Sequence, residues 1–441
     1  MTPTVSDAIA AGDVGPQLAD LALPDTQLAA HLRIEDAEAA RSTPVDDVRE
    51  TIRVGELPIP EIAPDEVLVA VMASAINYNT VWSALFQPVS TFSFLDRFAE
   101  QGGWAARHRQ PYHIVGSDAA GIVVRTGAAV HRWQAGDRVV ASPSWVDWQD
   151  PHADSMMAAD PRAWGFETNF GGLAYFAIAK ANQLMPKPTH LTWEEAACNG
   201  LCAVTAYRML VSPNGARMKQ GDLVLIWGAT GGLGSYAVQF VRNGGGIAAG
   251  VVSSEAKERV LRRLGCDLVL RRDQMGLDEL PEGERGRALG KAIRAELGED
   301  PHIVFDYVGS ATFATSVYLA RRGGAVVTCG SSTGYRHEYD NRHLWMRVKR
   351  IVGSHGANWQ ESWETNRLIS MGRVVPALSR VFPLSEAGDA ARLVQLNRHV
   401  GKVGVLCMAE REGLGVEDPE LREQVGEERL TLFRTAGMDV R

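Results

Sequence analysis

The chain has 441 residues, of which 45% are hydrophobic, and a formal net charge of −8. This length is typical of two domains, and the acidic balance argues against nucleic acid as a partner, because phosphate binding needs a basic surface. The five cysteines include no CxxC motif, so no disulfide framework is predicted and the reduced cytoplasm is favoured. The sequence shows neither a long apolar run nor the pattern of a leader peptide, so no membrane partner is expected.

The first part of the chain is predicted to be a β-rich domain with a helical N-terminal extension. Residues 1–50 are Ala-rich and acidic, with helical tendencies and little strand signal. From Ile52 onward, short apolar runs between Pro and Gly-Asp turns predict strands. The predicted strands are 66–73, 120–126, 137–141 and 172–179. Helices are expected in the aromatic insertion 85–113 and at 193–210, and the domain is assigned to residues 1–205.

The second part of the chain alternates apolar runs with helical segments. The predicted strands are 223–226, 247–252, 267–270, 302–308, 325–329 and 348–353. Six strands in this order predict an α/β fold with a complete doubly wound parallel sheet, over residues 206–358. Residues 359–441 are expected to return to the first domain and to end in an acidic helical tail from residue 409, used for packing or oligomer formation.

A glycine-rich turn follows the first strand of this sheet and precedes a helix. In such a turn, backbone N–H groups approach a pyrophosphate at the helix N-terminus, where the peptide dipoles favour an anion. The strand–turn–helix–strand context therefore predicts a dinucleotide site. The residues that form it are Gly228, Thr230, Gly231, Gly232, Leu233 and Gly234.

The end of the second strand indicates which dinucleotide binds. Sites for NAD usually carry an acidic residue there, about 20 residues past the glycines, to bind the ribose 2′-hydroxyl. This chain has Ser253 and Lys257, and Arg272 follows the next strand. Hydroxyl and cationic groups suit a 2′-phosphate, so NADPH is favoured over NADH. Glu255 is expected to point outward at a helix start, where carboxylates are stabilised.

Several motifs resemble one branch of the medium-chain dehydrogenase/reductase superfamily, the crotonyl-CoA (enoyl-CoA) carboxylase/reductases. They are AINYNTVW (75–82), GSDAAG (116–121), GFETNFGGLAYF (165–176), NQLMPKP (182–188), TAYRML (205–210), IWGATGGLGSYA (226–237), HEYDNRHLW (337–345) and GSHGAN (353–358). WGFETNFGG and EYDNR are specific to this branch. The resemblance spans about residues 52–416 and implies a GroES-like catalytic domain beside a Rossmann domain, with Thr205 and Cys329 as further cofactor residues.

The sequence departs from the zinc-dependent branch of this superfamily. Where those enzymes carry a Cys on the first loop and a Gly-His-Glu turn, this chain has 77–80 (NYNT) and 116–118 (GSD). Without a thiolate or an imidazole at these points, no metal site is predicted. A substrate handled without a Lewis acid must itself stabilise negative charge, as an alkene conjugated to a thioester does.

The resemblance implies NADPH-dependent reductive carboxylation of a 2-enoyl-CoA. Hydride adds to the β-carbon and the enolate attacks CO2, which gives an alkylmalonyl-CoA of the kind used as a polyketide extender unit. The family's pocket residues match Asn77, Phe166, Glu167 and His355. Asn and His supply donors for CO2, although Asn79 could replace Asn77. Phe166 would exclude water, and Glu167 would fix a water molecule or the orientation of Asn77.

The resemblance also implies where coenzyme A binds and how long the acyl chain is. Arg342 and Arg322 are candidates to bind the phosphates of coenzyme A. His343 stands where the family has a Tyr, a departure that weakens the case for adenine stacking at this position. Ala163 and Gly356 replace Ile and Phe, and the space gained suits a medium or long chain such as 2-octenoyl-CoA. The family's Glu-His-Pro is replaced at 306–308 (DYV), which nothing in the sequence explains.

Two other functions remain open from the sequence. One is an NADPH-dependent enoyl-thioester or quinone reductase that does not bind CO2, and the other is a non-catalytic NADPH-binding protein. The complete set of pocket residues and the CoA-binding arginines favour the carboxylase/reductase. A homo-oligomer, dimer or tetramer, is expected.

Overall fold

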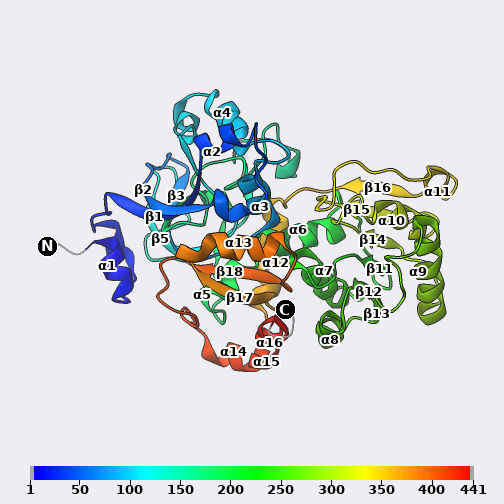
Figure 1. Ribbon diagram of the computed structural model, residues 1–441. Helices are drawn as coiled ribbons and strands as arrows, with labels where there is room; N and C mark the ends of the chain where they lie inside the picture. The colour runs from blue at the N-terminus through cyan, green and yellow to red at the C-terminus, as the bar shows by residue number, and fades with distance from the viewer. Residues whose placement is uncertain (1–3, 438–441) are drawn as a thin grey trace.

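The computed structural model describes residues 4–437 and contains two large sheets that lie side by side (Figure 1). The left-hand sheet is built from residues 66–186 and 378–406, and the right-hand sheet from residues 223–353. The predicted α/β fold, with a GroES-like domain beside a doubly wound sheet, is therefore confirmed. The domain boundaries at residues 205 and 358 stay predictions.

The left-hand sheet has seven strands in the order β10-β6-β5-β3-β18-β17, with β9 paired to β3. Every residue of its long strand β3 is buried. The strands are β3 (Glu66–Ile76), β5 (Ala120–Thr126), β6 (Arg138–Ala141), β9 (Phe176–Lys180), β10 (Leu184–Pro186), β17 (Leu378–Pro383) and β18 (Lys402–Leu406). Because β18 pairs with β3, the C-terminal part of the chain completes a sheet that the N-terminal part begins.

The right-hand sheet has six parallel strands in the order β13-β12-β11-β14-β15-β16, which is the order of a dinucleotide-binding sheet. Its strands are β11 (Leu223–Ile226), β12 (Ile247–Val252), β13 (Leu268–Arg271), β14 (Ile303–Phe305), β15 (Ala325–Thr328) and β16 (Arg350–Gly353). Its helices are α7 (Gly232–Asn243), α8 (Glu255–Arg263), α9 (Glu282–Leu297), α10 (Phe313–Leu319) and α11 (Arg342–Trp345). All six strands lie within three residues of the predicted bounds, because each is an apolar run between turns.

The N-terminal extension departs from the prediction of helices with little strand. It contains α1 (Val5–Ala10) and α2 (Ile34–Ala39), but also the strand β1 (Thr26–Arg33). This strand pairs with β2 (Arg53–Pro58) and β4 (Tyr112–Ile114). The strand contains buried polar residues, which disguise it because polar residues in a sequence suggest an exposed segment. Gln27 is buried, and its side-chain oxygen accepts a hydrogen bond from the Phe176 N–H at 2.6 Å.

The single helix predicted for residues 193–210 is wrong, because the chain breaks it into α5 (Trp193–Ala197) and α6 (Gly200–Val211). At the break the Leu201 N–H donates to a carboxylate oxygen of Asp118 at 2.6 Å. A side chain at Gly200 would begin 2.5 Å from the same oxygen. The break therefore opens the N-terminus of α6 to a carboxylate, which helix dipoles favour. The insertion 85–113 contains the helix α4 (Thr91–Ala99), as predicted, and α3 (Tyr78–Leu85) precedes it.

The C-terminal part forms α12 (Trp359–Ser370), α13 (Ala387–Gln395), α14 (Pro419–Val425), α15 (Glu427–Leu430) and α16 (Leu432–Gly437). The last three helices lie below the left-hand sheet in Figure 1, and α16 contacts β17 and the helix α8 of the other sheet. Arg422 pairs with Glu195 at 2.7 Å and Arg434 with Glu194 at 3.3 Å, so the tail neutralises two buried carboxylates of α5. The predicted helical tail begins at residue 419 rather than 409, and residues 1–3 and 438–441 lie outside the described residues. Across residues 4–437, no helix combines the length and the apolar character that crossing a membrane requires.

We expect the folded chain to lose stability between pH 7 and pH 5. Burial lowers the pKa of His113 to about 4, whereas an unfolded chain has a histidine pKa of about 6.5. The unfolded chain therefore takes up a proton in this interval that the folded chain does not, which costs about 2 kcal/mol of stability at pH 5. Urea unfolding at the two pH values measures the effect. His113→Asn should reduce the pH dependence and the exposed-site variant His152→Asn should not; equal behaviour of the two variants would contradict the assignment.

Candidate active site

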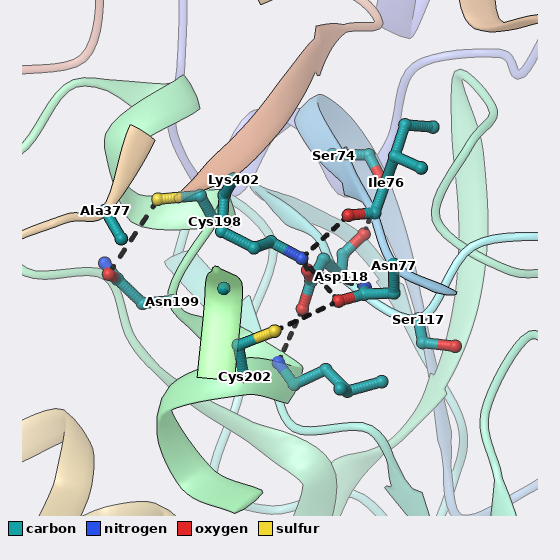
Figure 2. Close-up of polar contacts among 12 residues, drawn as sticks. Ser74, Ile76, Asn77, Ser117, Asp118, Cys198, Asn199, Cys202, Ala377 and Lys402 are labelled. Atoms are coloured by element: carbon teal, nitrogen blue, oxygen red, sulfur yellow. Dashed lines mark hydrogen bonds and ion pairs between the residues drawn. The ribbon is translucent and has the colours of Figure 1, made fainter. Parts of the chain in front are cut away.

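Asn77 lies where the two sheets meet, directly after β3 and at the N-cap of α3. Asn77 is 4% exposed, and all but one of the hydrogen-bonding positions of its amide are occupied. Nδ2 donates to Asp118 Oδ2 at 2.8 Å, and Oδ1 accepts from Lys402 Nζ and from the Cys202 thiol, whose sulfur is 3.5 Å away (Figure 2). An amide has two N–H donors and two acceptor lone pairs, so one N–H of Asn77 remains.

Asp118 and Lys402 form an ion pair of 2.9 Å beside this amide, and both side chains are at most 3% exposed. Lys402 Nζ also donates to the Ile76 carbonyl at 2.9 Å. Burial alone would lower the pKa of Lys402, but Asp118 and the neighbouring thiols raise it above its ordinary value. The sequence analysis did not identify either residue as functional. The available signals were the Gly-Ser-Asp turn and a lysine at the start of the apolar run GKVGVLC.

Phe166 and Glu167 follow the short strand β8 (Arg162–Ala163), which pairs with β7 (Ser144–Trp145). The Phe166 ring contacts Phe94 of α4, with ring centroids 5.8 Å apart. The Glu167 carboxylate accepts from the Ala163 N–H at 2.8 Å and closes the turn. Glu167 makes no hydrogen bond to Asn77 among the described residues. The side chains that contact this amide are Asp118, Lys402 and Cys202.

His355 and Gly356 lie in the loop after β16, at the carboxyl edge of the right-hand sheet. The His355 side chain is exposed and has no hydrogen-bond partner within the described part of the chain. Gly356 has a φ of +52°, and a Cβ there would lie 2.9 Å from Ser144 Oγ and 3.3 Å from Met156 Cε. The expected open space at Gly356 is therefore filled by these side chains, and glycine is needed for the backbone. Ser144 also pairs with Ala163, so both substituted positions flank one serine.

The remaining candidate, Asn79, makes different contacts from Asn77. Its amide nitrogen donates to Ser117 Oγ at 2.8 Å. Its oxygen is buried and has no partner among the described residues. Asn79 thus keeps one free N–H, as Asn77 does. Its unpaired oxygen would repel the oxygens of CO2, so Asn77 fits the CO2 role better.

The glycine-rich turn lies between β11 and α7 as predicted, with Gly231 as the N-cap of the helix. The Tyr307 hydroxyl donates to the Gly228 carbonyl at 2.8 Å, so this tyrosine packs over the turn. Asp306 is fully buried and accepts hydrogen bonds from Val308 N at 3.0 Å and Ser316 Oγ at 2.6 Å. The 306–308 segment that departs from the family pattern thus shapes the turns around the dinucleotide site.

The end of β12 gathers the groups predicted for a 2′-phosphate. Lys257 Nζ donates to Ser253 Oγ at 3.3 Å. Burial and then the charge of Arg272 lower the pKa of Lys257. Arg272 also pairs with Asp278 at 3.4 Å. Glu255 begins α8 and is 74% exposed, so it points outward as predicted. These residues fit NADPH.

The other predicted cofactor residues lie in α6, after β15 and at the glycine-rich turn. Thr205 is buried in α6, and Cys329 follows β15, where burial raises the pKa of its thiol to about 12. Thr230 is buried and its carbonyl accepts from the Gly401 N–H at 2.7 Å. Leu233 is half-buried in the first turn of α7.

The two arginines proposed for coenzyme A are both exposed. Arg342 begins α11 and pairs with Asp340 at 2.6 Å, and its side chain is 75% exposed. Arg322 follows α10 and has no hydrogen bond or ion pair among residues 4–437. The His343 ring is edge-on to Tyr318 at 5.0 Å, so it packs on protein instead of lying free for adenine.

An aromatic row that the sequence analysis missed crosses from α3 to the loop after β15. The Tyr78 and Trp82 rings are 5.3 Å apart, and Trp82 lies 6.0 Å from Tyr335. Tyr335 remains 52% exposed. In the described part of the chain, no group of three or more His, Cys, Asp or Glu side chains is arranged to hold a metal ion.

Two family models match the chain. One describes the alcohol dehydrogenase GroES-like domain and covers residues 63–189; the other describes a zinc-binding dehydrogenase and covers residues 232–370. The two ranges correspond to the left-hand and right-hand sheets of the structure.

Similar proteins extend over nearly the whole chain. A crotonyl-CoA reductase of Streptomyces collinus is 51% identical over 95% of this chain and 96% of its own length. A crotonyl-CoA carboxylase/reductase of Cereibacter sphaeroides is 41% identical over 80% and 83%. A solved structure of a 2-octenoyl-CoA carboxylase reductase with NADP and 2-octenoyl-CoA has 58% identity and a TM-score of 0.95, and the match covers 98% of this chain and 99% of that one. The chain belongs to the crotonyl-CoA carboxylase/reductase family.

Proposed function

We propose that this protein is an NADPH-dependent enoyl-CoA carboxylase/reductase that converts a 2-enoyl-CoA and CO2 into an alkylmalonyl-CoA. The observation that carries this proposal is the end-to-end likeness to an enzyme solved with NADP and 2-octenoyl-CoA. Related enzymes are also solved with NADP. The cationic site at Ser253, Lys257 and Arg272 supports the same cofactor form.

The pocket residues support carboxylation in addition to reduction. NADPH, when bound, supplies a hydride for the β-carbon of the enoyl thioester, and the resulting enolate is the nucleophile for CO2. The remaining N–H of Asn77 would donate to a CO2 oxygen, with the exposed His355 ring as a second donor. Phe166, packed on Phe94, would keep out water that could protonate the enolate first. Glu167 would hold a water molecule at the turn that it closes.

A reductase that does not fix CO2 is the main rival, since some relatives are named crotonyl-CoA reductases. Measuring NADPH oxidation by an enoyl-CoA with and without bicarbonate, together with the mass of the product, distinguishes the two activities. A product that never gains the mass of CO2 would contradict the proposal. No NADPH oxidation in either case would favour the non-catalytic alternative.

We expect Asn77→Leu and His355→Asn to reduce carboxylation more than hydride transfer, because both donors act after the enolate has formed. The ratio of alkylmalonyl-CoA to saturated acyl-CoA should fall by a factor of about 10 or more, as loss of one hydrogen bond at a transition state typically costs 10²–10³ in rate. Product analysis by mass spectrometry measures the ratio. His131→Asn, at an exposed site, serves as the control, and an unchanged ratio in both pocket variants would refute the assignment.

We propose a medium-chain substrate such as 2-octenoyl-CoA. Two observations support it: Ala163 is a small residue beside the turn of Phe166, and the solved relative is described as a 2-octenoyl-CoA enzyme. Gly356 has a positive φ and faces filled space, so Ala163 is the position that could make room for a longer chain.

Restoring bulk with Ala163→Ile should therefore lower kcat/KM for octenoyl-CoA through overpacking, at a cost of about 1–3 kcal/mol. Crotonyl-CoA, which is shorter, should be affected little, so the preference between the two substrates should shift. Ala159→Ile, at an exposed alanine of the same segment, is the matched control. If Ala163→Ile alters both substrates equally, the pocket assignment is wrong and the carboxylase/reductase proposal is unaffected.

We propose that the enzyme is a homo-oligomer that assembles through the edge strand β16. This strand ends the right-hand sheet and is largely exposed. Large apolar side chains surround it, and edges of this kind favour pairing with another strand. They are Trp345 (63% exposed), Met346 (54%), Val348 (68%) and Ile351 (38%).

Ile351→Lys should shift the protein toward the mass of one chain in light scattering, because a charge on an edge strand opposes pairing. Met371→Lys, at another exposed apolar residue, should leave the mass unchanged. A wild-type protein with the mass of a single chain would exclude the oligomer.

We also propose a cytoplasmic location and a product that serves as a polyketide extender unit.

A further inference from the structure

The buried ion pair beside Asn77 has no role in the proposed chemistry so far. Asp118 comes from the loop before β5, and Lys402 is the first residue of β18. Both side chains are almost completely buried. Burying a charged pair is expensive, and such a pair contributes little net stability compared with apolar residues of similar size. Its presence at the centre of the candidate site therefore calls for a role other than stability.

The Lys402 ammonium and one carboxylate oxygen of Asp118 are directed at the Asn77 amide, at each other and at the backbone before Asn77. Lys402 Nζ donates to the Ile76 carbonyl, to Asn77 Oδ1 and to Asp118 Oδ2, which uses its three protons (Figure 2). Asp118 Oδ1 accepts from the Leu201 N–H at the start of α6. Neither charged group retains a donor for a ligand, so the pair itself does not contact the substrate.

The same contacts determine which way the Asn77 amide faces. If the amide rotated by 180°, its NH2 group would meet the Lys402 ammonium and its oxygen would meet the Asp118 carboxylate. Both contacts would be repulsive in a site that excludes water, where electrostatic interactions are strong. The Cys202 thiol, as a second donor to Oδ1, adds to the preference.

We propose that Asp118 and Lys402 are positioning residues for carboxylation: they lock the Asn77 amide so that its free N–H faces the reacting centre. This inference rests on the proposed role of Asn77 as a CO2 donor. The hydride step needs no such donor, so the pair should control the partition between carboxylated and merely reduced product. Without the lock, the amide could present its oxygen, which repels the oxygens of CO2.

The first test is Asp118→Asn, which keeps the shape of the side chain and removes its charge. Its single oxygen can accept either from Leu201 or from the Asn77 and Lys402 side, but not from both. We expect the ratio of alkylmalonyl-CoA to saturated acyl-CoA to fall at least tenfold at saturating bicarbonate, with a smaller change in NADPH oxidation. Ser74→Ala is the matched control, since Ser74 Oγ bonds only the backbone carbonyl of Asp118 at 2.6 Å, and its ratio should equal that of the wild type.

A second variant separates positioning from folding. The exchange Asn77→Asp with Asp118→Asn restores a carboxylate next to Lys402 and an amide beside it, but leaves residue 77 without an N–H. Its melting temperature should return toward that of the wild type while the product ratio stays low. A ratio that recovers together with the melting temperature would overturn the inference, because the pair would then act only through stability.

The outcomes also distinguish this inference from the proposed function. If Asn77→Leu lowers the product ratio and folded Asp118→Asn does not, the positioning role is wrong and the CO2 role of Asn77 stands. If Asn77→Leu leaves the ratio unchanged, the CO2 role fails and the positioning role fails with it. A lowered ratio in both, with no further loss when the two are combined, supports a single pathway through the amide.

Discussion

A carboxylate and an ammonium group that share one buried site, Asp118 and Lys402, connect the parts of this chain that form the active site. The pair joins the loop before β5 to the first residue of β18, across 284 residues of sequence. Through its hydrogen bonds it also holds the end of β3 and the start of α6. The break between α5 and α6 exists where this carboxylate meets the helix N-terminus. Several irregular features of the fold thus follow from accommodating one ion pair.

The same lysine also links the amide to the dinucleotide turn. Its aliphatic chain passes the beginning of α7, where a Cβ on Gly232 would lie 3.1 Å from Lys402 Cδ and 2.9 Å from the Cys202 sulfur. The preceding residue, Gly401, donates its N–H to the Thr230 carbonyl of the turn. A glycine in this turn therefore serves packing between the two halves of the molecule in addition to the approach of a phosphate. Residues 401 and 402 thus contact both the cofactor turn and the Asn77 amide.

Sequence reasoning succeeded where structure depends on local pattern. The strands β11 and β12 are apolar runs of the right length, and the bounds predicted for them match. Ser253 and Lys257 are predictable because they follow the second strand, where a site for NAD would carry an acidic residue. Prediction failed where distant segments decide. The strand β1 gains its conformation from β2 and β4, and its buried Gln27 resembles a surface residue in sequence.

The same limit applies to the site. Asn77 could be selected by its motif, but the residues that orient it could not, because nothing local marks Asp118 and Lys402 as partners. For Glu167 the sequence leaves two roles open, a bound water molecule or the orientation of Asn77, and in the structure its carboxylate accepts from the Ala163 N–H. The open space inferred at Gly356 is occupied by Ser144 and Met156. Side chains that refill a pocket come from other segments and cannot be seen in a list of substitutions.

The position of β18 between β3 and β17 has a consequence for how the protein is made. The right-hand sheet uses one continuous stretch of chain and can form as soon as that stretch leaves the ribosome. The left-hand sheet lacks an interior strand until residues 402–406 have been synthesised. Until then the Asp118 carboxylate has no counter-ion, because Lys402 is the first residue of that strand. The strands of the right-hand sheet can thus be in place before residues 401–402 pack on its glycine-rich turn, and the surroundings of Asn77 are assembled among the last parts of the molecule.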